Sequence, residues 1–236
     1  MIEIITSFYI SNLQHPLDNV RTNEIITTLK NNLKNEFVEK IHLFVDNELS
    51  LNLLFELKNH IDNTNKIVVN YFKKQPKYSD YFRYILENVK NKICMITNSD
   101  IFLLECDKQL IDRLKTEKIM YCLTRHEENL NCPLIDRYEG SHDCYIFNSS
   151  FIETSIINEH TDFYQNMNGI EHHIITTFFN SGFLLFNPCK QIKIVHLHSS
   201  ELRGNYVWVG FHPLNSSSNE FIKINKPYYH VPPEYI

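Results

Sequence analysis

Alanine is absent from this sequence and glycine is scarce: of 236 residues, none is alanine and only 5 are glycine. Asparagine, isoleucine, lysine, phenylalanine and tyrosine are abundant instead, and these residues have AT-rich codons. The composition therefore indicates an AT-rich genome, and the high number of asparagines carries little functional information.

Glycine-dependent motifs are also lacking. The chain has no G-x-x-x-x-G-K-[ST] phosphate loop, no G-x-G-x-x-G fingerprint and no G-x-S-x-G elbow. P-loop kinases, dinucleotide oxidoreductases and acyl hydrolases therefore lose their main support. The contiguous residues Ser141, His142 and Asp143 do not supply a hydrolase triad, because a triad is an arrangement in space.

The chain is weakly acidic, with 23 Lys and Arg against 28 Asp and Glu and a net charge of -5. Without a strongly basic window, it is not expected to bind nucleic acid. No apolar run approaches the roughly 20 residues that span a bilayer, and a basic secretory leader is missing, so we expect a soluble, intracellular protein without a transmembrane segment. Six cysteines without a C-x-x-C pair predict neither a disulfide framework nor a zinc ribbon.

The first half of the chain alternates strand-like and helix-like patterns. Strand-like runs occupy residues 2–10, 41–45, 67–69 and 92–97, and helical patterns lie between them at about 20–33, 50–60 and 77–89. This alternation predicts an α/β fold with a mixed, mostly parallel central sheet and helices on both of its faces.

The second half continues with strand-like runs at 118–124, 142–148 and 191–198 and a helix between Gly169 and Gly182. We expect one domain over residues 1–200, with two halves that meet at about residue 100. Residues 201–236 are rich in Tyr, Pro, Ser and Asn, which predicts an arm that packs on the domain or a weakly ordered tail.

A short polar segment interrupts two apolar runs at Asn98, Ser99 and Asp100. Ligands of parallel sheets collect at the carboxyl ends of the strands, and this segment directly follows the fourth predicted strand. Oxygen ligands there suit Mg²⁺ or Mn²⁺. The alternative is an Asx-turn between two core strands, which needs no metal.

Two histidines lie at the end of the last strand-like run. His196 and His198 alternate with Leu197, so they point to the same side of a strand and either one could bind a metal or a phosphate. Arg203 is a candidate phosphate ligand. The alternatives are a pair of half-exposed strand histidines and a surface arginine.

The predicted helix after Gly169 begins with Glu171, His172 and His173. A glutamate in the first turn can serve the helix dipole alone, or it can accept a proton from an attacking hydroxyl. The two adjacent histidines diverge by about 100° on a helix, so they are a poor two-ligand clamp for a metal.

Taken in order, these segments resemble a glycosyltransferase of the GT-A fold, of a small single-domain kind found in large DNA viruses and bacteria. The blocks that carry the resemblance are RTNEIITTLKNN from Arg21, IHLFVDN, PKYSDYFRYI, ICMITNSDIFL, YCLTRHE, GSHDCYIF, GIEHHIITTFFNSGF and IKIVHLHSSELR. If the source is viral, the resemblance places the protein in the cytoplasm of the host cell. It also implies one catalytic domain over residues 1–200, with a nucleotide-binding half up to about residue 100 and a half for the donor sugar and acceptor after it.

The resemblance implies a D-x-D-like motif at residues 98–100, in which Asp100 binds Mn²⁺ or Mg²⁺ and the metal holds a nucleoside-diphosphate sugar. Asn98 departs from the family pattern because it carries no charge. A histidine near the end of the core joins the metal or the diphosphate in such enzymes, and either His196 or His198 fills this place, His198 being preferred because it is nearer the carboxyl end of the strand.

The remaining site residues come from the same resemblance. Glu171 would be the catalytic base and Asp143 would contact the donor sugar or the acceptor. The nucleotide would be bordered by Ser7, Phe8, Tyr9, Tyr78, Asp80, Asn98, Ser99, Arg125 and Arg203. An early-helix charge remains the alternative role for Asp80.

The implied reaction is the metal-dependent transfer of a sugar from a nucleoside-diphosphate sugar to a hydroxyl of a glycan or glycoprotein acceptor. A UDP-sugar is the expected donor. The configuration would invert if Glu171 lies on the acceptor side. The alternatives are a sugar-phosphate nucleotidyltransferase, which usually carries a Gly-rich phosphate loop after the first strand, and an inactive domain that binds a nucleotide or glycan. The sugar and the oligomeric state are left open by the sequence.

Overall fold

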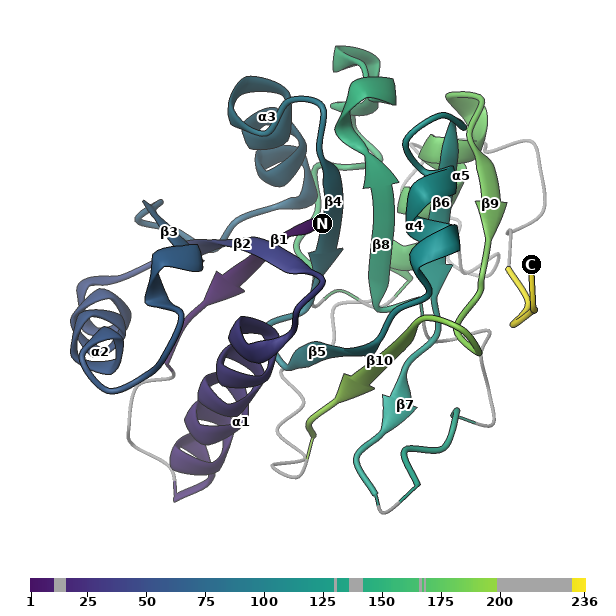
Figure 1. Cartoon of the computed structure of the whole chain (residues 1–236). Coiled ribbons are helices and arrows are strands. Elements are labelled where there is room, and N and C mark those ends of the chain that lie inside the picture. Colours follow the sequence, from purple (N-terminus) through teal and green to yellow (C-terminus); the bar gives the residue numbers. More distant parts are fainter. Residues whose placement is uncertain (11–15, 130, 136–141, 166, 168, 199–230) are drawn as a thin grey trace, which may run out of the picture.

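The structure is a computed structural model that describes residues 1–10, 16–129, 131–135, 142–165, 167, 169–198 and 231–236. Its centre is a seven-stranded sheet with strand order β3-β2-β1-β4-β8-β6-β9 (Figure 1). In chain order these strands are β1 (Ile2–Phe8), β2 (Val38–Val45), β3 (Ile67–Tyr71), β4 (Ile93–Thr97), β6 (Ile119–Leu123), β8 (Cys144–Asn148) and β9 (Leu184–Phe186).

The sheet is mostly parallel. Strands β3, β2, β1 and β4 pair in parallel, and so do β6 and β9. Strand β8 is antiparallel to both of its neighbours, β4 and β6. The amino end of β8 therefore lies at the same edge of the sheet as the carboxyl ends of β1, β2, β4 and β6.

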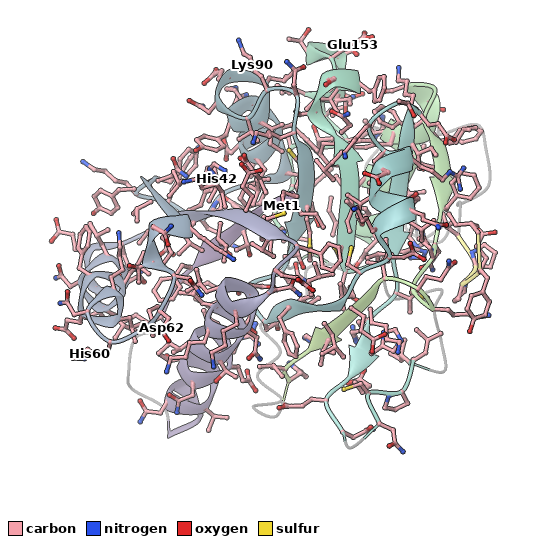
Figure 2. The ribbon with its side chains drawn as sticks, in the orientation of Figure 1. Met1, His42, His60, Asp62, Lys90 and Glu153 are labelled. Atoms are coloured by element: carbon pink, nitrogen blue, oxygen red, sulfur yellow. The ribbon has the colours of Figure 1, made fainter. Side chains whose placement is uncertain are left out.

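Helices cover both faces of this sheet, as the alternating pattern predicts. They are α1 (Pro16–Lys34), α2 (Glu48–Lys58), α3 (Tyr78–Asn88), α4 (Lys108–Arg113) and α5 (Ile170–Asn180), with short 3₁₀ turns η1 (Thr64–Lys66), η3 (Ser149–Phe151) and η4 (Thr154–Ile156). Apolar side chains of α1, α2 and α4 pack on one face, and those of α3 and α5 pack on the other. Figure 2 draws the described side chains on the ribbon in the same view as Figure 1. In β4, Ile93 and Met95 face the first group while Cys94 and Ile96 face the second, because side chains alternate along a strand.

A second, three-stranded sheet has the order β5-β10-β7 and consists of β5 (Ile101–Glu105), β10 (Lys193–His196) and β7 (His126–Glu127). It lies below the carboxyl end of β4 in Figure 1. Strand β10 pairs antiparallel with β5 and parallel with β7. The strand predicted at 191–198 therefore exists over a shorter range, and it belongs to this small sheet because strand pairing depends on segments far away in the sequence.

Two asparagines, Asn32 in the last turn of α1 and Asn35 just after it, cover the outer edge of β5. The Asn32 side chain accepts a hydrogen bond from the Leu103 amide at 2.9 Å and donates one to the Ile101 carbonyl at 3.2 Å. Asn35 donates to the Leu103 carbonyl at 2.9 Å. Exposed strand edges can pair with strands of other chains. Here the side chains of Asn32 and Asn35 occupy this edge of β5 instead.

The helix termini have clear local causes. Asn47 accepts a hydrogen bond from the Ser50 amide at 2.8 Å and so caps α2. Gly169 precedes α5 with a φ of 85°, a left-handed conformation that favours glycine. Gly182, with a φ of 80°, follows the helix, so the predicted start and end glycines of this helix are confirmed.

The last residues of the chain lie along the end of β9. Asn187 donates a hydrogen bond to the Val231 carbonyl at 2.7 Å, and the Ile236 amide donates to the Gln191 side chain at 2.8 Å. Most of the arm predicted at 201–236 lies outside the described residues. Within the parts of the chain that the structure does describe, no helix has the length and apolar character needed to cross a bilayer.

Candidate functional site

The side chains of interest gather at one edge of the central sheet. Strand β4 ends at Thr97 and β6 ends at Leu123, and both of these residues pair with Cys144 at the start of β8. The residues that follow Thr97, follow Leu123 and precede Cys144 are therefore neighbours in space. These are the segments that contain Asp100, Arg125 and Asp143.

The polar segment at residues 98–100 is a turn and also positions a carboxylate. The Ile101 amide donates to the Asn98 carbonyl at 3.2 Å, which closes the turn between β4 and β5. These strands belong to different sheets, so the turn carries the chain from one sheet to the other. Asp100 is buried there with 4% of its surface exposed.

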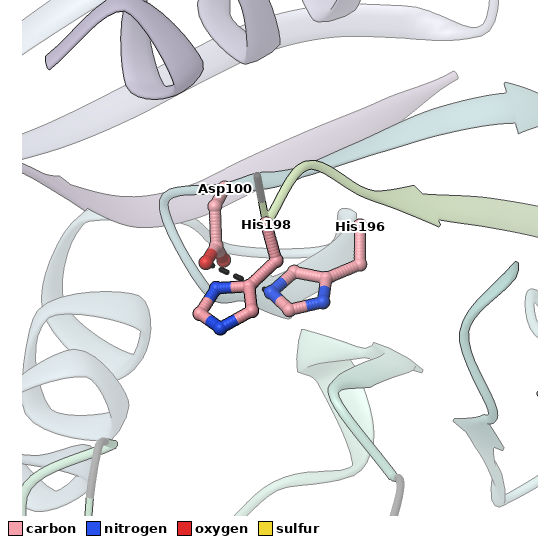
Figure 3. Close-up of side chains that lie close together, drawn as sticks. All are labelled: Asp100, His196 and His198. Carbon is pink, nitrogen blue, oxygen red and sulfur yellow. Dashed lines mark hydrogen bonds and ion pairs between the residues drawn. The ribbon is translucent and has the colours of Figure 1, made fainter. Parts of the chain in front are cut away.

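Two histidines meet Asp100 at this turn (Figure 3). His196 Nε2 lies 2.9 Å from Asp100 Oδ2, and the rings of His196 and His198 stack with centroids 5.0 Å apart. One potential ligand atom from each of the three residues lies within 4.8 Å of the others. The prediction that both histidines point to the same side is confirmed.

Several atoms of this group are buried and form no hydrogen bond with the described residues: Asp100 Oδ1, His196 Nδ1 and His198 Nδ1. Buried polar atoms without partners are uncommon in folded proteins, and a bound ion is one usual explanation. Carboxylate oxygen and imidazole nitrogen are both ligands of divalent transition metals. The donor set therefore fits a divalent ion that one carboxylate and two imidazoles could hold.

Arg21 of α1 also contacts Asp100. Its Nη1 lies 2.6 Å from Asp100 Oδ2 and 3.1 Å from Glu24 Oε2, and its Nη2 donates to the Tyr9 hydroxyl at 3.3 Å. Arg21 begins one of the sequence blocks quoted above, but the pattern predicts no role for it. The only feature of the sequence that indicates a contact of Arg21 is a glutamate, Glu24, three residues later on the same helix.

The electrostatics of this group follow from burial and charge pairing. Burial alone would raise the pKa of Asp100, but the hydrogen bond from His196 and the charge of Arg21 hold it well below its usual value. Burial lowers the pKa of Arg21, and Asp100 and Tyr9 more than compensate and raise it. For His198, burial and the nearby His196 and Arg21 lower the pKa. Asp100 is therefore ionised at neutral pH.

A second charged group lies at the start of β8. Arg125 contacts Asp143, with Nη1 to Oδ2 at 3.3 Å, and its Nε donates to Glu127 at 3.1 Å. The Thr97 hydroxyl donates to the Asp143 carbonyl at 3.4 Å. The structure thus brings Arg125 and Asp143 together, and it ties them to the end of β4 that precedes Asp100.

Glu171 lies in the first turn of α5 and is partly buried. Burial, together with the nearby charge of Asp143, raises the pKa of Glu171 to about 7. The charge of Glu171 acts in turn on Tyr78, whose pKa burial raises well above its usual value. Glu171, Asp143 and Tyr78 therefore share one electrostatic environment, and Glu171 can exchange a proton near neutral pH.

The other residues predicted to border a nucleotide differ in accessibility. Ser7 near the end of β1 and Tyr9 just after this strand are partly exposed. Phe8 between them is 1% exposed and packs in the core. Tyr78 is also buried. Asp80 accepts a hydrogen bond from the Lys77 amide at 3.0 Å and pairs with Arg83 at 3.2 Å, so it stabilises the start of α3.

Asn98 is partly exposed and Ser99 is buried, both in the turn that carries Asp100. His173 is buried on α5, where its Nδ1 lies 3.4 Å from Nδ1 of His160. Arg203 lies outside the described residues.

No protein-family model matches this chain, and no curated protein matches it in sequence. Solved structures do match its fold. A crystal structure of S. aureus TarS residues 1–349 in complex with UDP-GlcNAc matches with a TM-score of 0.51 and 11% identity, over 87% of this chain and 61% of that chain. Another crystal structure of S. aureus TarS matches with a TM-score of 0.50 and 10% identity, over 85% of this chain and 37% of that one.

The fold is GT-A-like. The predicted fold class is therefore confirmed, while the chain spans less than two thirds of the length of these TarS structures. In open α/β sheets, ligands bind at the carboxyl ends of the strands. Asp100, His196 and His198, which could hold a divalent ion, lie at this edge, and so do Arg125 and Asp143.

Proposed function

We propose that this chain is a glycosyltransferase that moves a sugar from a nucleoside-diphosphate sugar to a hydroxyl of a glycan or glycoprotein acceptor. The observation that carries the proposal is the meeting of Asp100, His196 and His198 at the carboxyl edge of a GT-A-like sheet. The TarS structure of the same fold contains UDP-GlcNAc, which supports a UDP-sugar as the donor.

Mn²⁺ or Mg²⁺ is the proposed cofactor, held by Asp100, His196 and His198. Such an ion offsets the negative charge that develops on the leaving diphosphate. Asn98 stands where the family motif has a further acid, so this site has one carboxylate in its motif and relies on imidazole nitrogen for the remaining protein ligands.

Glu171 is the proposed base. Its pKa of about 7 suits a group that accepts the proton of an acceptor hydroxyl at neutral pH, because catalytic bases work best when their pKa is near the working pH. Arg125 holds Asp143 at 3.3 Å, which keeps a carboxylate available for hydroxyl groups of the donor sugar or the acceptor. With Glu171 on the acceptor side, the reaction inverts the configuration of the sugar.

The nucleotide would lie along the ends of β1 and β4. Ser7 and Tyr9 are accessible enough to contact the nucleoside, and Asn98, Ser99 and Arg203 are proposed to contact the diphosphate or its metal. Arg125 is proposed to border the same space, whereas Tyr78 is buried in the core. We leave Phe8 and Asp80 out of this pocket, since Phe8 packs in the core and Asp80 stabilises a helix start.

The test is release of UDP from a panel of UDP-sugars in the presence of Mn²⁺, with water and simple glycans as acceptors. Asp100→Asn should reduce the rate at least 100-fold, because the proposed metal loses its only charged ligand. The matched control Asp112→Asn changes an exposed acid that pairs with Lys115 at 2.6 Å, and it should keep the rate.

The outcomes separate the competing functions. An inactive binding domain would bind UDP with Mn²⁺ but release no UDP from any sugar donor. A nucleotidyltransferase would instead consume UTP and a sugar phosphate and form pyrophosphate. If no nucleotide or nucleotide sugar stabilises the protein, with or without Mn²⁺, the proposed function is wrong.

A further inference from the structure

Arg21 is the one strong cation that contacts Asp100 among the described residues, and the proposed reaction gives it no role. We propose that Arg21 is an internal competitor of the divalent metal: it neutralises Asp100 when no donor is bound, and it releases Asp100 when a diphosphate offers it an alternative anion. The inference deepens the proposed function and rests on it for the part that concerns the donor.

The first reason is geometric. Arg21 Nη1 lies 2.6 Å from Asp100 Oδ2, and His196 Nε2 lies 2.9 Å from the same oxygen. This oxygen is therefore saturated, while Asp100 Oδ1 is buried and forms no hydrogen bond with the described residues. An incoming metal finds one free carboxylate oxygen instead of two, together with a positive charge directly beside it.

The second reason is the balance of charge. Arg21 carries one positive charge and contacts two buried carboxylates, Asp100 and Glu24, which are 4% and 5% exposed. Removal of Arg21 would take one positive charge away from beside these two carboxylates. Buried charges interact strongly because water screens them poorly. The guanidinium must therefore weaken the binding of a divalent cation at Asp100.

The third reason is the preference of the guanidinium itself. Arginine binds phosphate oxygens with paired hydrogen bonds, which a planar fork of donors favours. Among the described residues, Arg21 is held by one oxygen of Asp100, one oxygen of Glu24 and the Tyr9 hydroxyl, so its contact with Asp100 can be exchanged for a phosphate. Tyr9 follows β1 at the edge where the donor is proposed to bind, which places Arg21 next to that ligand. Metal and diphosphate should thus bind cooperatively.

The experiment measures Mn²⁺ binding to the full chain by electron paramagnetic resonance of free Mn²⁺, without nucleotide. Arg21→Gln removes the charge and should tighten Mn²⁺ binding at least tenfold relative to the unmodified protein. Arg21→Lys keeps the charge and should stay within about threefold of the unmodified protein, as expected if charge dominates this contact. Arg113→Gln is the matched control, because it removes an arginine that pairs with Glu117 and not with Asp100.

In a second series, saturating UDP is added to the protein with Mn²⁺. Free UDP is then removed by filtration, and the Mn²⁺ that stays bound to the protein is measured. UDP should tighten Mn²⁺ binding to the unmodified protein at least tenfold, and this coupling should shrink in Arg21→Gln, because the competitor is already gone. Linkage requires Mn²⁺ to tighten UDP binding by the same factor.

Folding of each variant is checked by circular dichroism, and Arg21→Met, which keeps the aliphatic stem, replaces Arg21→Gln if the latter does not fold. The inference is overturned if the charge-free variant binds Mn²⁺ no more tightly than the unmodified protein, including the case in which neither binds it. Failure of UDP to bind would contradict the proposed function instead, because the first series contains no nucleotide.

Discussion

Asp100 shows how one side chain can serve two partners. Its Oδ2 atom contacts both Arg21 and His196, so the carboxylate is charged and held in place before any ligand binds. A buried charge is costly unless it is paired, and the two cationic or donor partners compensate this cost. The sequence alone predicts the acid and the histidines but not the arginine.

Asp100→Asn should destabilise the protein by about 2 kcal/mol at pH 7, because it removes a buried charged partner of Arg21. The pKa of Asp100 is lower in the folded state than in the unfolded state, so its contribution is present above the unfolded pKa of about 3.9 and is lost as the pH falls below it. Urea unfolding at pH 7 and pH 3 checks this.

The difference between Asp100→Asn and the unmodified protein should shrink at pH 3. Asp112→Asn, an exposed acid, is again the control and should change stability by less than about 0.5 kcal/mol at neutral pH. A stability difference for Asp100→Asn that does not depend on pH would contradict the ion pair with Arg21.

Glu171→Gln should lower the transfer rate by about 10² to 10⁴, which is the usual contribution of a general base. In the unmodified protein, kcat/KM should rise with pH and level off above about 7, where Glu171 loses its proton. The pH profile of kcat/KM for UDP-sugar and acceptor is the measurement. Glu171 would be excluded as the base if the profile of the unmodified protein had no inflection near pH 7. It would also be excluded if the same inflection persisted in Glu171→Gln.

Ionisation of Glu171 lowers the stability of the folded state, whereas ionisation of Asp100 raises it. Because burial raises the pKa of Glu171, its ionised form is destabilising, and this cost grows as the pH rises from the unfolded value of about 4.3 through about 7. Glu171→Gln should therefore become more stable relative to the unmodified protein at pH 8 than at pH 5, which thermal unfolding at the two values can show.

At the scale of elements, helix α1 is the clearest case in which tertiary structure overrides pattern. Its apolar residues Ile25, Leu29 and Leu33 pack on the central sheet, as their spacing predicts. Its polar residues Glu24, Thr28 and Asn32 are buried as well, since a second sheet lies beside the helix. Periodicity assigns such polar residues to solvent because it contains no information about a distant sheet.

Asn32→Ala should destabilise the protein by about 2 to 3 kcal/mol, because it leaves the Leu103 amide and the Ile101 carbonyl without their partner at a buried position. Asn88→Ala is the matched control, a helical asparagine whose side chain donates only to the Tyr84 carbonyl at an exposed site. Urea denaturation of both variants is the measurement. Equal effects of the two substitutions would mean that the edge of β5 does not depend on Asn32.

At the scale of the whole molecule, Asn187 joins three distant segments. It is fully buried, accepts a hydrogen bond from the Thr124 amide at 3.1 Å, and donates to the Thr124 hydroxyl at 2.8 Å and the Val231 carbonyl at 2.7 Å. The end of β6, the end of β9 and the last residues of the chain therefore share one side chain.

Asn187→Ala should lower the unfolding free energy by about 2 to 3 kcal/mol, since the variant removes a buried partner from the Thr124 amide, the Thr124 hydroxyl and the Val231 carbonyl. Amide hydrogen exchange in the C-terminal residues 231–236 should speed up at the same time, because Val231 loses one of its two side-chain partners among the described residues and keeps only His142. Asn180→Ala, an exposed residue at the end of α5, is the control and should change neither. Unchanged exchange in Asn187→Ala would contradict the anchoring role.

The sequence by itself determined the order of strands and helices in the α/β fold, the helix between two glycines, and a polar turn after β4 with two histidines on one side of a later strand. These features depend on local periodicity, on backbone conformations that favour glycine and on the carboxyl-end rule. They are properties of neighbouring residues, which a sequence shows directly.

Only the tertiary structure decided that β5, β10 and β7 form a separate sheet, that Arg21 and His196 share one oxygen of Asp100, and that Arg125 contacts Asp143. Strand pairing and ion pairing join residues far apart in the chain, here 79 and 96 positions for the two partners of Asp100. Such contacts depend on the packing of the whole molecule, because many pairs of residues could meet and only the fold selects which of them do.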